Sequence, residues 1–102
     1  MNGYGFHPDA VKDLEEIWEF IAQDSLDAAD QVLDDIQEAI QMLVRIPRQG
    51  HQRTELTSHP LRFWRVHSYL IAYVPEEPLL VIAVLHGRRN PRVMAAILKT
   101  RT

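Results

Sequence analysis

With 102 residues, the chain has room for one folded domain around one core, and we expect residues 1–102 to form it. Its 46% hydrophobic and 25% charged residues are typical of a soluble globular protein, and its lack of cysteine excludes a disulfide framework and a thiolate metal site. The net charge of −3 conceals an acidic first half, with three Lys/Arg against eleven Asp/Glu in residues 1–50, and a basic second half, with eight against three. Such asymmetry suggests that one surface has an anionic partner.

Two amphipathic helices are predicted in the first half. Pro8 suits the first position of a helix and Asp9 places negative charge beside its free N–H groups, so the first helix should begin there. Asp24 or Ser25 should cap the second helix, and Pro47 prevents it from continuing. So short a loop predicts an antiparallel hairpin. The apolar stripes have helical spacing: Val11, Leu14, Ile17, Trp18 and Ile21 in one helix, and Ala29, Val32, Leu33, Ile36, Ile40, Leu43 and Val44 in the other.

The acidic residues of the first helix fall mostly off its apolar stripe. We expect them, Asp13 included, to form a face exposed to solvent.

The second half changes to strand composition. Residues 48–60 are mostly polar and lack periodicity, so they are predicted to be a connection. Three β-rich segments follow, at Leu61–His67, Tyr69–Val74 and Leu79–His86, and Tyr4–Phe6 could add an edge strand. A short helix should start at Asn90-Pro91 and run through Leu98. We therefore expect an α+β domain of two layers, in which an N-terminal antiparallel helical hairpin packs on a three- to four-stranded antiparallel sheet and a short C-terminal helix follows.

Five arginines gather in the second half. Arg62 and Arg65 belong to the first of the three strands, and Arg88, Arg89 and Arg92 follow the last strand after His86-Gly87. A planar guanidinium binds phosphate or carboxylate through two parallel hydrogen bonds, which suits an anionic partner. The alternative is that these arginines pair with the acids of the helical half and serve solubility. Their concentration at a strand and the following turn favours a functional surface.

The histidines give a weaker indication. None of the five is spaced to place two ligands on one helix face or loop, so we expect no metal site, and no motif indicates a cofactor. His86 ends an apolar strand beside the arginines, where an imidazole could act as an acid or base or could make a structural hydrogen bond. Nucleophile elbows, phosphate-binding glycine loops and zinc-protease helices do not occur in the sequence.

No segment predicts membrane insertion. The longest apolar run, Leu79 to Leu85, is far shorter than the ~20 residues of a membrane span, and residues 1–5 lack the basic-then-apolar pattern of a signal peptide. We therefore expect a cytoplasmic protein without a membrane partner.

The order and spacing of these parts resemble a known group of proteins, the RelE/ParE superfamily of type II toxin-antitoxin toxins, over nearly the whole chain. The resemblance implies a compact toxin that is neutralised by an antitoxin encoded beside it, in a hetero-oligomeric complex. The residues that carry it are Pro8-Asp9-Ala10, Asp13-Leu14, Ile17, Leu43, Pro47, Gly50, Tyr69-x-x-x-Tyr73 and Val84-Leu85-His86-Gly87-Arg88-Arg89.

Two branches of the superfamily imply different targets. The RelE-like branch cleaves mRNA on the ribosome with basic residues and a C-terminal tyrosine, and an arginine typically follows the first tyrosine of its Tyr-x-x-x-Tyr strand. This chain has Leu70 and Met94 at those two positions, and neither side chain can transfer a proton or stabilise the transition state. Arg88 alone matches a basic catalytic position. The ParE-like branch, which resembles this chain in its first helix and in its His-Gly-Arg-Arg ending, is associated with poisoning DNA gyrase by binding.

Three hypotheses follow. The first is a ParE-like toxin that is not an enzyme and blocks replication by binding DNA gyrase through Arg65, Arg88, Arg89 and Arg92. The second is ribosome-dependent mRNA cleavage through Arg62, Arg65, His86 and Arg88. The third is a non-toxic relative that acts as a binding module.

Overall fold

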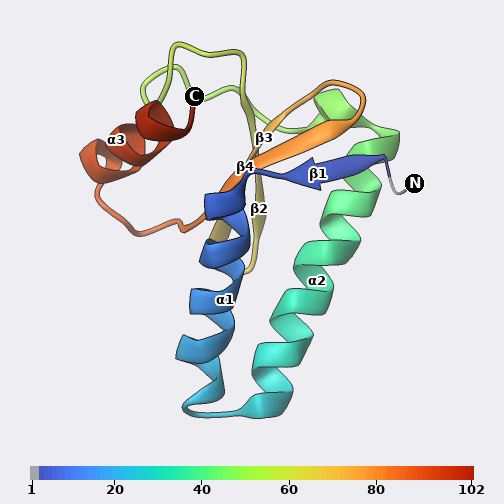
Figure 1. The fold of residues 1–102 in the computed structure, drawn as a ribbon, viewed down its shortest axis with the longest axis vertical. Helices are drawn as coiled ribbons and strands as arrows, with labels where there is room; N and C mark the ends of the chain where they lie inside the picture. Colours follow the sequence, from blue (N-terminus) through green and yellow to red (C-terminus); the bar gives the residue numbers. More distant parts are fainter. Residues whose placement is uncertain (1–2) are drawn as a thin grey trace.

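A computed structural model describes residues 3–102 as three α-helices and a four-stranded sheet (Figure 1). The sheet has the order β1-β4-β3-β2. In Figure 1, α1 and α2 run side by side, and α3 lies across the strands from them. The elements are β1 (Tyr4–Phe6), α1 (Pro8–Ala22), α2 (Leu26–Arg45), a short 3-10 helix (Pro47–Gln49), β2 (Arg62–Val66), β3 (Tyr69–Val74), β4 (Leu79–His86) and α3 (Pro91–Arg101).

The helices begin where their capping residues place them. The His7 ring accepts a hydrogen bond through Nδ1 from the Asp9 amide (3.0 Å) and caps α1, which starts at Pro8 as predicted. Ser25 is the cap of α2, because its hydroxyl oxygen accepts from the Ala28 amide at 3.1 Å. Each cap satisfies one of the N–H groups that the first helical turn leaves free.

The sheet confirms the three predicted strands and the edge strand. β2, β3 and β4 pair in antiparallel fashion, with Arg65 opposite Leu70 and Tyr69 opposite His86. β1 pairs with β4 in parallel, with Phe6 opposite Val81, so the expectation of an antiparallel edge is corrected. Parallel pairing needs a long crossover, and the helical hairpin with β2 and β3 supplies it between these two strands.

The first core lies between the sheet and the hairpin of α1 and α2. Alternation along β3 directs Tyr69, Ile71 and Tyr73 to this face, where all three are buried. Burying one such side chain contributes about 1.5–3 kcal/mol, so this face supplies much of the driving force for folding. Its other buried members are Ala10, Ile17, Ile36, Ile40, Leu43, Leu79, Val81 and Val84.

A second core on the opposite face corrects the expected two-layer arrangement. Helix α3 and the 50–61 connection cover this face, so the sheet lies between two helical layers. Residues 48–60 were predicted to be a mostly polar connection, but Leu56 within them is only 3% exposed, as is Leu61, which was predicted to begin a strand. A single apolar residue in a polar segment lacks periodicity, which is why the sequence did not indicate the burial of Leu56. The buried members of this core are Leu56, Leu61, Phe63, Leu70, Ala72, Ile82, Ala83, Leu85, Met94 and Leu98.

Strand β4 extends beyond the end of its short neighbour β1. Beyond Val81 the edge of β4 has no strand beside it within the described part of the chain. Two side chains bond this edge instead: Asp13 Oδ2 accepts from the Val84 amide at 3.0 Å, and Arg101 Nη1 donates to the Ile82 carbonyl at 3.1 Å. Side chains that bond an open edge also block further strand pairing.

Asp13 was expected to face solvent, and this expectation is wrong. Its side chain is only 12% exposed. Asp13 lies three residues after Ala10 and four before Ile17, which are both buried, so it shares their face of α1.

The hydroxyl of Tyr73 anchors the end of α2 to the sheet. It donates to the Pro47 carbonyl at 2.6 Å and accepts from the Gly50 amide at 3.0 Å. A Cβ atom at residue 50 would collide with this hydroxyl, so the contact needs glycine there. Burial raises the pKa of Tyr73, which keeps the phenol protonated and able to donate.

We predict that Tyr73→Phe lowers the free energy of unfolding by about 1–3 kcal/mol, because it leaves the Pro47 carbonyl and the Gly50 amide without their partner. Urea denaturation at neutral pH measures the change. Tyr69→Phe is the matched control, since the Tyr69 hydroxyl makes no hydrogen bond within residues 3–102, and it should change stability by no more than ~0.5 kcal/mol. Equal losses in the two variants would contradict the anchoring role.

Candidate functional site

Four of the five arginines lie at one end of the sheet. Arg65 is near the end of β2, opposite Leu70, and a Cβ atom added at Gly87 would lie 3.7 Å from Arg65 Nη2. The guanidinium of Arg65 is therefore beside the loop that carries Arg88 and Arg89. Arg92 follows in the first turn of α3. We call Arg65, Arg88, Arg89 and Arg92 the arginine cluster.

The backbone of this loop is held by hydrogen bonds at both ends. At the strand end, the Gly87 amide donates to the Ser68 carbonyl (2.7 Å) and the Arg89 amide to the His86 carbonyl (3.0 Å). At the helix end, the Asn90 side chain accepts from the Arg92 amide at 2.8 Å and caps α3. The loop thus presents its arginines from a fixed backbone.

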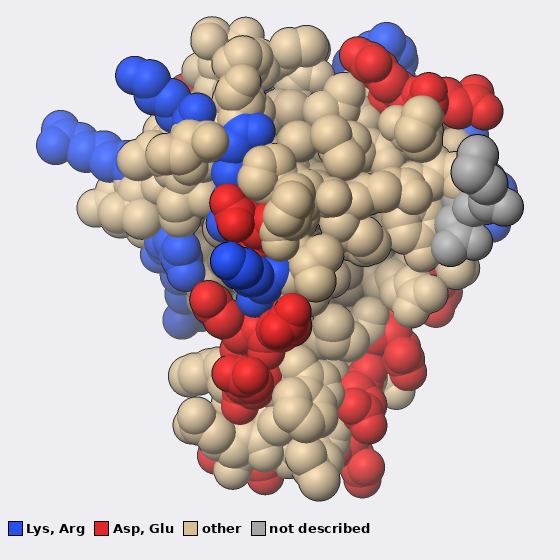
Figure 2. Space-filling model, viewed as in Figure 1, with Lys and Arg blue, Asp and Glu red and all other residues tan. Residues whose placement is uncertain are grey.

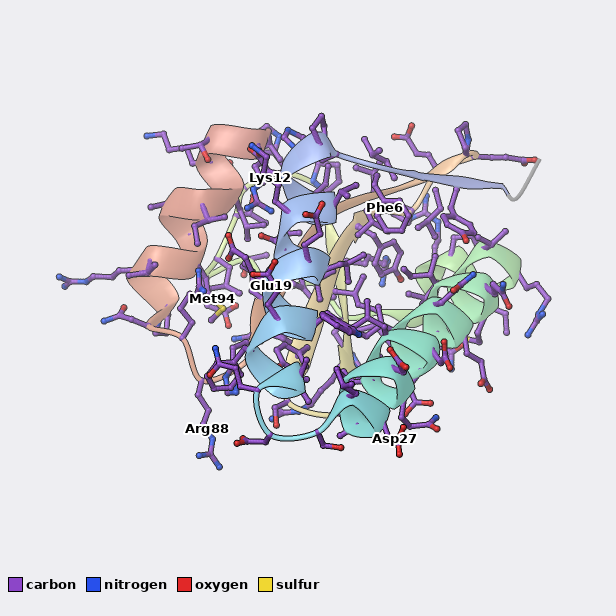
Figure 3. All side chains as sticks on the ribbon, turned by 60° about the horizontal axis from the view of Figure 1, so that its bottom comes forward. Phe6, Lys12, Glu19, Asp27, Arg88 and Met94 are labelled. Carbon is purple, nitrogen blue, oxygen red and sulfur yellow. The ribbon has the colours of Figure 1, made fainter. Side chains whose placement is uncertain are left out.

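The guanidiniums of the arginine cluster have no acidic partner. Among the ion pairs of residues 3–102, none includes Arg65, Arg88, Arg89 or Arg92. Figure 3 shows the Arg88 side chain projecting away from the molecule, whereas Met94 points inward from α3. The N-terminus of α3 adds partial positive charge to this surface. An anionic partner would relieve the repulsion among these charges.

Acidic and basic side chains gather over different elements on the face of the molecule shown in Figure 2. In Figure 2, acidic side chains follow α1 and α2, and basic side chains gather mainly on the α3 side. The alternative hypothesis, that these arginines pair with the acids of the helical hairpin, is therefore not supported, because no member of the arginine cluster forms an ion pair within residues 3–102. Arg101, which the sequence analysis did not single out, is the arginine that pairs with α1, through Asp13.

Arg62 lies apart from the arginine cluster. It is opposite Tyr73, near the other end of the β2–β3 pairing, and alternation directs it to the opposite face from Arg65. Its Nη1 donates to the Gly50 carbonyl at 2.8 Å and to the Arg48 carbonyl at 3.2 Å. These bonds give Arg62 a structural role beside Tyr73.

His86 is brought next to the arginine cluster. Its Nδ1 accepts a hydrogen bond from the Arg88 amide at 3.1 Å, and its ring packs edge-on against Tyr69 at a centroid distance of 5.3 Å. It lines a cleft of about 390 Å³ between α1 and the end of β4, together with Arg89 and the 69% exposed Phe20. Because Nδ1 is occupied, the ring presents Nε2 as its free nitrogen.

The two positions that separate the superfamily's branches are buried. Leu70 is 9% exposed and Met94 2% exposed, and both belong to the second core. Of the four residues proposed for mRNA cleavage, Arg65, His86 and Arg88 lie at one end of the sheet and Arg62 at the other. The structure thus brings three of these residues together but places no tyrosine or arginine at the two diagnostic positions.

The turn between β2 and β3 supports Arg65. Arg65 Nε donates to the His67 carbonyl at 3.1 Å, and His67 has a positive φ of 54°. The His67 ring reaches α2, where Nε2 lies 2.6 Å from Asp35 Oδ2. This contact ties the turn to the helical hairpin and offsets the cost of a left-handed backbone in a residue other than glycine.

Other kinds of site find no support. Residues 3–102 contain no group of three or more His, Asp or Glu side chains that could hold a metal ion. No helix in the described part of the chain is long and apolar enough to cross a membrane.

Comparison with known proteins identifies the family. The family model described as the ParE toxin of type II toxin-antitoxin system, parDE, matches residues 4–91. The chain belongs to the ParE toxin family. This match confirms the resemblance found in the sequence and extends from β1 to the first residue of α3.

The fold agrees with this membership. A solved chain from the chromosomal ParDE TA system of P. aeruginosa superimposes with a TM-score of 0.66 at 16% sequence identity. The alignment covers 82% of this chain and 94% of that chain. At such low identity the likeness is one of fold. No curated protein matches the chain closely enough to add a relative.

We predict that His67→Ala raises the pKa of Asp35, which lies below its ordinary value because the carboxylate accepts hydrogen bonds from His67 first and from Gln31 second. A carboxyl ¹³C NMR titration measures this pKa. Because the pKa is lowered in the folded state, the pair stabilises the fold above the ordinary Asp value of about 3.9, and this contribution is lost as the pH falls through the lowered pKa.

Gln31→Ala is the control for this titration and should raise the pKa of Asp35 less, since Gln31 is the second contributor. An Asp35 pKa that stays the same in His67→Ala would show that the turn is not tied to α2.

Proposed function

We propose that this protein is the toxin of a type II toxin-antitoxin pair, that it blocks replication by binding DNA gyrase, and that a cognate antitoxin neutralises it in a hetero-oligomeric complex. The observation that carries the proposal is the arginine cluster, four guanidiniums on a fixed loop and strand end that form no ion pair with an acid of residues 3–102. Membership of the ParE toxin family supports the toxin assignment.

The chemistry of the arginine cluster favours an anionic surface on the target. Guanidiniums bind carboxylates or phosphates through paired hydrogen bonds, and a charged rim mainly speeds association. An anionic target surface would attract the arginine cluster and repel the acidic hairpin of α1 and α2. The two charged surfaces together would therefore orient the protein as it approaches the target.

The residues around the arginine cluster favour binding to the target over catalysis of a reaction. General acid–base catalysis needs a group that can give or take a proton within hydrogen-bond reach of the substrate. Met94 and Leu70 cannot do so and are buried, and Arg62 is engaged with main-chain carbonyls. Two rings that can carry a proton lie nearby: Tyr69, whose side chain is buried in the first core, and His86, whose Nδ1 is already engaged with the Arg88 amide.

An apolar groove on the hairpin supports the antitoxin partner. Two adjoining clefts of about 300 and 270 Å³ share Leu14 and Leu33 and extend from the 42% exposed Val11 to the edge strand β1. An amphipathic antitoxin helix would fit the apolar floor, and a strand could add to the free edge of β1. A second antitoxin segment that covers the arginine cluster should be acidic.

Purified protein should inhibit the supercoiling of relaxed plasmid DNA by gyrase. The Arg88→Ala, Arg89→Ala double variant should reach the same inhibition only at a concentration at least about tenfold higher, because it lacks two of the charges proposed to contact the target. The matched control is Arg45→Ala, Arg48→Ala, which removes two exposed arginines at the end of α2. This control should inhibit like the wild type.

Untouched supercoiling at high protein excess would contradict the gyrase assignment. Expression without antitoxin gives an independent reading: filamentous cells with DNA-damage signalling support gyrase as target. Rapid translation arrest with cut transcripts would support mRNA cleavage instead, and normal growth would support a non-toxic binding module.

The protein should co-elute in size-exclusion chromatography with the product of the neighbouring antitoxin gene. Val11→Glu should weaken this complex about tenfold or more in a titration, because it places a charge in the apolar groove. Leu80→Glu is the control, since Leu80 is also partly exposed (37%) but does not line the groove. Separate elution of the two wild-type proteins would contradict the partner.

A further inference from the structure

A bidentate ion pair links the end of the C-terminal helix α3 to α1. Arg101 Nη1 lies 2.6 Å from Asp13 Oδ2, and Arg101 Nη2 lies 3.0 Å from Asp13 Oδ1. The same two side chains bond the open edge of β4, at Ile82 and Val84. Three elements that are far apart in the sequence, α1, β4 and α3, therefore meet at this pair.

The Asp13–Arg101 pair is shielded from water. The side chains of Asp13 and Arg101 are 12% and 10% exposed, and their hydrogen bonds to each other are charge-assisted. The hydrogen bond to Asp13 raises the pKa of Arg101 above its usual range, so the guanidinium stays charged. Removing one member of such a pair leaves the other charged, partly buried and without its partner, which is destabilising locally.

The charge of the C-terminal segment explains why α3 depends on this pair. Residues 87–102 contain five basic side chains and no Asp or Glu, so the segment cannot neutralise itself. Asp13 is its closest acid, and Asp9 approaches Arg101 Nε only to 4.0 Å. Apart from this pair, α3 is held mainly by Met94 and Leu98 in the second core.

The position of α3 determines where the loop arginines lie. Only Gly87–Asn90 separate the end of β4 from α3, and hydrogen bonds fix this loop to both elements. A shift of α3 must therefore move Arg92, which lies in the helix, and pull on the short loop that carries Arg88 and Arg89. The family match ends at residue 91, so Arg101 and nearly all of α3 lie outside it.

We propose that Asp13 and Arg101 are positioning residues for the arginine cluster: by clamping α3 to α1 and to β4, they hold the 87–92 segment in the arrangement that meets the target. The predicted effect of this pair on target binding rests on the proposed function. The placement of the segment itself does not depend on that function.

The test compares two variants with two matched controls. Arg101→Gln and Asp13→Asn each break the pair, whereas Lys99→Gln and Glu15→Gln remove the same charges from exposed residues on the same helices that make no contact with the pair. Hydrogen–deuterium exchange of the antitoxin-free protein reports the placement of the segment, and gyrase supercoiling reports its consequence. Arg101→Lys, which keeps the charge but not the paired geometry, should fall between wild type and Arg101→Gln.

We expect the amides of residues 87–93 to exchange about tenfold faster in Arg101→Gln and Asp13→Asn, with exchange in β3 and α2 unchanged, because local opening costs less when a buried pair is lost. Half-maximal gyrase inhibition should need about tenfold more of these variants than of the controls. Unchanged exchange at 87–93 would overturn the proposal. Equally faster amide exchange across the whole chain would also overturn it, because the pair would then contribute only to global stability.

The two proposals can fail separately. If the wild type leaves gyrase untouched, the gyrase function falls, and faster exchange confined to 87–93 still supports the positioning role. If both variants inhibit gyrase like the wild type while exchange at 87–93 rises, the target does not need a fixed loop, and the functional part of the inference is overturned.

Discussion

Strand β4 sets the constraint from which the rest of the architecture follows. Apart from the partly exposed Leu80, its apolar run from Leu79 to Leu85 is buried on both faces, so one helical layer cannot cover it. The hairpin of α1 and α2 packs on one face and α3 on the other, and each contributes its own core. A C-terminal helix is thus required by the sheet, and the loop that leads to it carries the arginines to the end of β4.

Much of this fold could be predicted because its elements carry local signals. Pro8, the Asp24-Ser25 break and Pro47 bound the helices, and period-two apolar segments mark the strands. What could not be predicted depends on partners distant in the sequence. The parallel pairing of β1 and the burial of Leu56 have no local signature, since both depend on what lies beside them after folding.

The candidate site, like the fold, could be predicted only where its residues are close together in the sequence. Arginines adjacent along the chain could be assigned to one surface, but Arg62 and Arg65 lie three positions apart on a strand and so face opposite sides. Asp13 was misjudged because acids on helices usually face water. Its spacing from Ala10 and Ile17 was the available signal, and without knowledge of Arg101 as its partner that signal predicts an unfavourable buried charge.

The parallel pairing of β1 also bears on when the fold can form. Tyr4–Phe6 is synthesised well before its partners, residues 79–81, and Asp13 lacks its counterpart until residue 101 has been added. On a translating ribosome the helical hairpin can form early from local contacts, while the sheet edge and the arginine surface must wait for the C-terminal segment. The order of synthesis therefore delays the arginine cluster from taking its final arrangement until residue 101 has emerged.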